Sequence, residues 1–165
     1  MDQTNFDNRL LRKQRRRRPR EWKVVSVREC PPPEEMILVN TPDHAVDYWR
    51  QNIATMPWFN PDCECLAVLI LNTKLRVRGH HLVSIGSLNE TSAHPREIFR
   101  VAVAAAAYCV LLMHNHPSGE VEPSNADRRL TKRVQEAGEL LQIEVRDHVI
   151  VGHNRLFSFR DSGAL

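Results

Sequence analysis

The most informative stretch of the sequence is His114-Asn-His116-Pro-Ser-Gly-Glu-Val-Glu-Pro-Ser124-Asn-Ala-Asp127. It follows the apolar run 108–113, which is typical of a short buried strand. Side chains two residues apart on a strand point to the same face, so His114 and His116 can bind one ion together. The residues 117–119, Pro-Ser-Gly, end the ladder and turn the chain, which places the histidine pair at the carboxyl end of the strand.

The next segment predicts an amphipathic helix that begins at Ser124. Its apolar residues recur on one helical face, at Leu130, Val134, Ala137 and Leu141. Ser124-x-x-Asp127 is typical of a helix start, with a serine cap and an acid in the first turn. From that turn, Asp127 can reach the same ion as the two histidines. Two imidazole nitrogens, one carboxylate oxygen and an open fourth position are what a catalytic zinc ion needs, so the pattern indicates a cap, a zinc site, or both.

This arrangement resembles a known family motif. The spacing His-x-His, seven residues, Ser, two residues and Asp is similar to that of the JAMM (MPN-type) metalloproteases. Further stretches resemble the bacterial RadC family, historically called DNA repair proteins, and they occur in the order 94–100, 114–119, 137–141 and 147–152. The resemblance runs from Thr41 to Leu165, and it implies a JAMM/MPN deaminase-like sandwich of the α/β (α+β) class.

The resemblance also implies a zinc-dependent hydrolase, a peptidase or isopeptidase. Its metal ligands would be His114, His116 and Asp127, and Ser124 would lie beside the bound water. RadC proteins commonly carry a helix-hairpin-helix region before this domain, and we find no such pattern in residues 1–40. That difference weakens any DNA repair role taken from the family name.

A site of this kind needs a glutamate as general base. Zinc lowers the pKa of its bound water to about 7, and a carboxylate within hydrogen-bond reach takes the proton as the water attacks a carbonyl. Glu64 is the candidate, because it directly precedes the apolar run 65–71 and the family's glutamate likewise precedes such a strand. A solvated glutamate at a strand entrance is the competing interpretation. The rival bases are Glu90 and Glu97, although an acid at Glu97 is favourable for the helix dipole alone.

Ser124 is expected to act beside the base. Its hydroxyl would donate a hydrogen bond to the oxyanion or to the water, and such donors are typically worth about 3 kcal/mol.

Composition agrees with one globular domain. The chain has 165 residues, of which 42% are hydrophobic and 26% charged. No apolar run approaches the ~20 residues that span a bilayer, and the amino terminus lacks the apolar segment of a secretory signal. The four cysteines, Cys30, Cys63, Cys65 and Cys109, suggest no disulfide framework. We therefore expect a cytoplasmic protein without a membrane partner.

Positive charge is concentrated at the start of the chain. Residues 1–20 hold eight Lys or Arg and two acids, a net charge of +6, so the remainder carries −3 of the total of +3. We expect a basic, disordered tail over residues 1–30, a Pro-rich linker over 31–40, and a RadC-like domain over 41–165. Residues 9–20 could bind nucleic acid through its phosphates, or could serve only as a solubilising tail.

The order of predicted elements indicates a mixed β-sheet flanked by helices. Strands are expected over 65–71, 75–85, 108–113, 145–151 and 156–159, the last two as a hairpin, and helices from 42, over 95–107 and from 124. Alternation puts only one of Asp147 and His148 inward, so neither is assigned to the site.

Three functions compete: a zinc peptidase or isopeptidase, a DNA-processing factor, and a non-catalytic JAMM-like scaffold. The letters His-Asn-His do not indicate an HNH nuclease, because that motif spreads its residues over a hairpin and a helix. Scaffold members usually lack metal ligands, whereas His114, His116 and Asp127 are all present here.

Overall fold

A computed structural model describes residues 31–86 and 93–165. The expected basic tail, its segment 9–20 and the alternative base Glu90 lie outside the described residues. In chain order the elements are α1 (Pro42–Tyr48), a π-helical turn η1 (Trp49–Ile53), β1 (Cys65–Leu71), β2 (Val77–Ile85), α2 (Pro95–Ala104), β3 (Cys109–Asn115), α3 (Asn125–Leu141), β4 (Glu144–Val151) and β5 (Leu156–Ser158).

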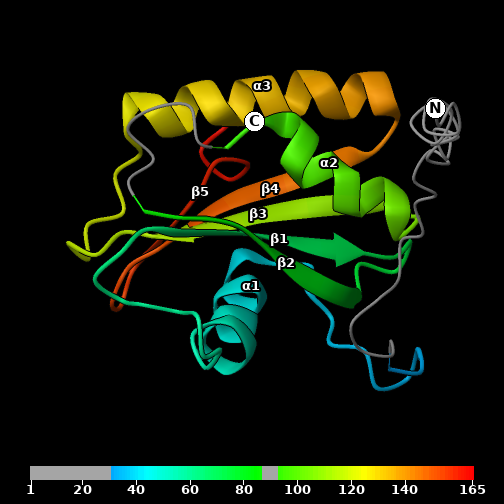
Figure 1. Ribbon diagram of the computed structural model, residues 1–165, viewed down its shortest axis with the longest axis horizontal. Coiled ribbons are helices and arrows are strands. Elements are labelled where there is room, and N and C mark those ends of the chain that lie inside the picture. Colours follow the sequence, from blue (N-terminus) through cyan, green and yellow to red (C-terminus); the bar gives the residue numbers. More distant parts are fainter. Residues whose placement is uncertain (1–30, 87–92) are drawn as a thin grey trace, which may run out of the picture.

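The strands form one five-stranded mixed sheet in the order β2-β1-β3-β4-β5. β3 and β4 are parallel, and the other neighbouring pairs are antiparallel. A parallel pair needs a connection that crosses over the sheet, and α3 makes this one. In Figure 1, α2 and α3 cover one face of the sheet and α1 covers the other. The predicted mixed sheet with flanking helices is confirmed.

Helices on both faces explain why β1 and β3 are apolar without interruption. Every residue of these two strands is buried. On the α1 face, alternate strand residues such as Leu69 and Leu111 pack with Trp49 and Ile53 of η1. On the other face, Leu112 packs in one cluster with residues of α2 and α3. His114 continues the row of Leu112, so its side chain lies on the α3 side.

Some element ends differ from the predictions. The second strand begins at Val77 rather than at residue 75, because Leu75 has a left-handed φ of 54° and ends a turn. The second helix ends at Ala104, and Ala106 follows with a φ of 48°. Leu141, expected on the apolar face of α3, is exposed at the helix end.

The last residues of the expected linker pack on the domain. Val39 is buried, and its amide donates to the Leu75 carbonyl at 2.9 Å. Leu38 forms a β-bridge with Arg76. The boundaries of tail, linker and domain stay predictions. In the part of the chain that the structure describes, no helix combines the length and apolarity needed to cross a membrane.

Gly138 lets α3 approach the start of β4. A Cβ at this position would lie 2.6 Å from the Ile143 carbonyl oxygen and 3.2 Å from Cζ of Phe99. We expect Gly138→Ala to lower the free energy of unfolding by about 1–3 kcal/mol, because the clash outweighs the better helix propensity of alanine. Chemical denaturation measures the change. The control is Gly79→Ala, whose added Cβ has no atom within 4 Å among the described residues; equal destabilisation in both variants would contradict the prediction.

Candidate metal centre

The end of β3 and the start of α3 bring three potential ligands together. His114 lies on β3, and the amide of His116 donates to the Val151 carbonyl of β4 at 3.3 Å, so both histidines are held by the sheet. Ser124 caps α3 in a capping box: its Oγ accepts from the Asp127 amide at 3.2 Å, and Oδ2 of Asp127 accepts from the Ser124 amide at 2.8 Å. The cap therefore fixes the carboxylate above the end of β3.

The three side chains converge on one point. Nε2 of His114 lies 3.0 Å from Nε2 of His116 and 3.3 Å from Oδ1 of Asp127, while Nε2 of His116 lies 3.6 Å from Oδ2. One ligand atom from each residue lies within 4.8 Å of the others. The predicted trio is thus placed as a group that could hold a metal ion. Cys63 and Cys65 are not part of this group.

Oδ1 of Asp127 provides a test of that fit. The Asp127 side chain is 1% exposed, and among the described residues Oδ1 has no hydrogen-bond partner. Buried carboxylate oxygens are normally paired with a donor or a cation. Nε2 of His114 lies beside this oxygen and Nε2 of His116 lies beside the other carboxylate oxygen, so a cation between the three residues would satisfy Oδ1. The residues present therefore fit a metal ion.

The hydrogen bonds of His116 leave the correct nitrogen free. Its Nδ1 lies 2.8 Å from the carbonyl oxygen of Glu120. A carbonyl only accepts, so Nδ1 carries the proton and donates. In the neutral ring, Nε2 then keeps a lone pair that faces His114 and Asp127.

Electrostatics suit a cation. Burial would raise the pKa of Asp127, but the facing His116 ring, attraction to His114 and the hydrogen bonds from Ser124 hold it well below its usual range. Burial, and then the neighbouring His148, lower the pKa of His114 well below its usual value. At neutral pH the site therefore presents a carboxylate beside an uncharged His114.

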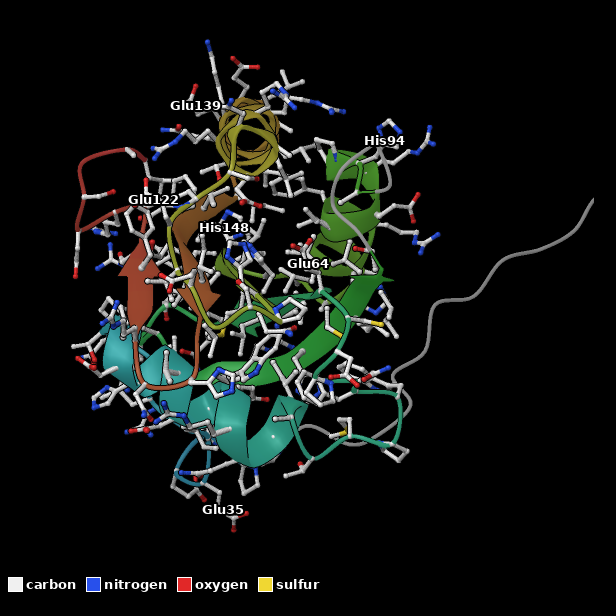
Figure 2. All side chains as sticks on the ribbon, turned by 90° about the vertical axis from the view of Figure 1, so that its left-hand side faces the viewer. Glu35, Glu64, His94, Glu122, Glu139 and His148 are labelled. Atoms are coloured by element: carbon white, nitrogen blue, oxygen red, sulfur yellow. The ribbon has the colours of Figure 1, made fainter. Side chains whose placement is uncertain are left out.

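Glu64 is close enough to influence the trio. The pKa of His116 is raised first by the Asp127 carboxylate that faces its ring and then, against the effect of burial, by the Glu120 carbonyl and by the negative charge of Glu64. Figure 2 views the molecule from the side on which β3 ends and α3 begins, and Glu64 and His148 both lie below α3 there. The rival Glu97 instead pairs with Arg96 at 3.4 Å and Arg100 at 3.1 Å on α2.

Asn115, between the two histidines, holds the backbone around Glu64. Its Oδ1 accepts from the Cys65 amide at 2.9 Å, and its Nδ2 donates to the Cys63 carbonyl at 3.0 Å. These two bonds clamp both peptide groups that flank the glutamate. Sequence reasoning missed this role, because the partners lie about 50 residues apart in the chain and no periodicity connects them.

Asp147 and His148 lie on opposite faces of β4, as alternation requires. Only His148 points toward the trio, as expected, and both residues are buried because helices cover both faces of the sheet. Asp147 accepts from the Ser158 hydroxyl at 2.6 Å and from the His148 amide at 2.7 Å on the far face. His148 bonds to His114, with 2.8 Å between its Nε2 and Nδ1 of His114, and burial lowers its pKa to about 4.

Ser124 contacts the trio through Asp127. Its Oγ donates to Oδ2 of Asp127 at 2.6 Å. The serine is exposed, so its hydroxyl is also open to solvent at the mouth of the site. Its expected role as a donor to the oxyanion or water stays a prediction.

The comparison with known sequences agrees with this geometry. Residues 39–164 match the family described as the RadC-like JAB domain. The chain belongs to the RadC-like JAB family. The resemblance to RadC proteins is thereby confirmed over most of the chain.

Relatives within the RadC-like JAB family carry the name UPF0758 protein. UPF0758 protein CT0611 of Chlorobaculum tepidum is 52% identical over 102 residues, which is 62% of this chain and 46% of the relative. A UPF0758 protein of Desulforudis audaxviator is 42% identical over 134 residues, covering 81% of this chain and 56% of that protein. One of Desulforamulus reducens is 38% identical over the same length, with 81% and 57% covered. The chain thus spans about half the length of the curated relatives it matches.

The geometry predicts that His116→Ala abolishes metal binding. With zinc ions as the probe, free ion at 100 times the dissociation constant should stabilise the wild type by about 2.7 kcal/mol, and the variant by nothing, because one of three ligands is gone. Thermal unfolding with and without zinc measures the effect. His44→Ala is the control, since this exposed histidine lies on α1, across the sheet. Full stabilisation of His116→Ala would overturn the ligand assignment.

Proposed function

We propose that this chain is a zinc-dependent metallohydrolase that cleaves peptide or isopeptide bonds. His114, His116 and Asp127 would hold the ion, and Glu64 would be the general base. The observation that carries the proposal is the convergence of two imidazole Nε2 atoms on the buried Asp127 carboxylate, with the charge of Glu64 beside them. Oδ1 of that carboxylate has no hydrogen-bond partner among the described residues.

The donor set favours zinc in a catalytic rather than a structural role. Imidazole nitrogens with one carboxylate suit zinc, and structural zinc sites are closed by four protein ligands. Among the described residues, the group consists of three side chains and includes no fourth protein ligand. A bound zinc ion supplies a Lewis acid for the substrate carbonyl and lowers the pKa of a coordinated water to about 7.

Three residues around the ion then have defined tasks. Glu64 accepts the proton of the attacking water and can pass it to the leaving amine. Asn115 keeps Glu64 in place through the two flanking peptide groups. Ser124 orients Asp127 and donates a hydrogen bond toward the oxygen on which negative charge develops. Together these residues support amide hydrolysis.

The expected substrate is a protein or peptide with an accessible amide or isopeptide bond, because both bonds present the same carbonyl to the site. Binding of nucleic acid by residues 9–20 is a separate hypothesis, which rests on the charge of that segment alone. The scaffold hypothesis is disfavoured by the complete trio and by the buried Oδ1 of Asp127, which has no hydrogen-bond partner in the part of the chain that the structure describes.

Glu64→Gln should separate metal binding from catalysis. We expect the variant to bind zinc like the wild type and to lose hydrolysis by about 10²–10⁴-fold, because the amide cannot accept the proton. Zinc-loaded protein would be incubated with a library of proteome-derived peptides and with isopeptide-linked peptides, and the new carboxyl termini, which both reactions release, would be counted by mass spectrometry.

The matched control for this experiment is Glu97→Gln, which removes a glutamate paired with arginines on α2. It should cleave like the wild type. If Glu64→Gln cleaves at the wild-type rate, the base is misassigned. If the zinc-loaded wild type cleaves nothing in either library, the proposed function itself fails.

A further inference from the structure

A buried chain of hydrogen bonds runs from His114 away from the candidate metal centre. Nδ1 of His114 lies 2.8 Å from Nε2 of His148 on β4, and Nδ1 of His148 lies 2.7 Å from Oγ1 of Thr131 on α3. Oγ1 of Thr131 lies 2.7 Å from the carbonyl oxygen of Asp127. This hydrogen-bond relay, from His114 through His148 and Thr131 to the Asp127 carbonyl, thus connects both ligand-bearing elements, β3 and α3, through β4.

The direction of every bond follows from its far end. The Asp127 carbonyl can only accept, so the Thr131 hydroxyl donates its one proton to that carbonyl. Toward His148 that hydroxyl must therefore accept, which places a proton on Nδ1 of His148. His148 is fully buried, and a neutral ring with a proton on Nδ1 has a lone pair on Nε2. That lone pair accepts from Nδ1 of His114, and Nε2 of His114 is left unprotonated toward Asp127.

Packing holds the relay ring in place. His148 stacks on Phe159 with 4.9 Å between ring centroids and an interplanar angle of 10°. Both rings are buried, and so is Thr131. A ring packed in this way cannot flip without disturbing the core, so the two nitrogens of His148 keep their separate partners.

We propose that His148 and Thr131 are positioning residues that hold His114 in the tautomer with a free Nε2, the form able to bind metal. The inference rests on the proposed metal site and adds residues that contact no reacting atom. Outer partners that fix a ligand histidine typically contribute 10–100-fold to metal affinity.

Thr131 offers the sharper test, because two substitutions differ mainly in the hydroxyl. Thr131→Val keeps the shape and removes the acceptor for Nδ1 of His148. The His148 proton can then move to Nε2 and donate to His114, whose own proton is forced onto Nε2, the atom that faces the site. Thr131→Ser keeps the hydroxyl and the relay.

The experiment measures zinc dissociation constants of the full chain by competition with a chromogenic chelator. We expect Thr131→Val to bind about 10–100-fold more weakly than the wild type, and Thr131→Ser to stay within about threefold. In the metal-free wild type, long-range ¹H–¹⁵N spectra of the histidine rings should place the protons of His114 and His148 on Nδ1. In Thr131→Val the His114 proton should appear on Nε2.

Each failure has a separate meaning. Wild-type affinity in a folded Thr131→Val variant overturns the relay alone, as does a wild-type His114 protonated on Nε2. The proton position on His114 tests the relay even if Thr131→Val does not fold, because it is measured on the wild type. A wild type that binds no zinc overturns the metal site and this inference with it.

Discussion

The buried carboxylate of Asp127 is the interaction on which the rest of the site depends. A buried acceptor left without a partner costs roughly 1–3 kcal/mol, and more when it is charged. Oδ2 is satisfied by the Ser124 cap, whereas Oδ1 has no hydrogen-bond partner within the described ranges. The fold tolerates this cost at the point where two imidazole nitrogens converge. A cation bound there would remove the penalty and link the end of β3 to the start of α3.

Topology explains why those groups meet. Because β3 and β4 are parallel, the chain must leave the carboxyl end of β3 and cross the sheet, and α3 is that crossing. The start of α3 therefore stands above the end of β3, and a cap residue three positions before Asp127 aims its carboxylate at the histidines. The neighbouring strands supply the supporting contacts: Asn115 clamps the entrance of β1, and His148 of β4 backs His114. One crossover connection thus organises ligands, base and support.

Sequence reasoning was most successful where local patterns carry the information. The apolar run before His114 and the Ser124 cap predicted β3 and α3, and the motif spacing predicted the trio that the structure brings together. It was less successful where tertiary packing decides. Asp147 and His148 could not be ranked, since alternation does not show that helices cover both faces of β4. The roles of Asn115 and Thr131 depend on partners distant in the chain, on β1 and β4, and composition gives no sign of them.

We propose that His114, His116 and Asp127 bind one catalytic zinc ion. Anomalous diffraction at the zinc edge from crystals of the zinc-loaded full chain tests it most directly. We expect one peak at about 2.0–2.2 Å from Nε2 of His114, from Nε2 of His116 and from a carboxylate oxygen of Asp127, with water in the fourth position. A peak bound by other residues, a fourth protein ligand closing the site, or no peak at this trio would contradict it.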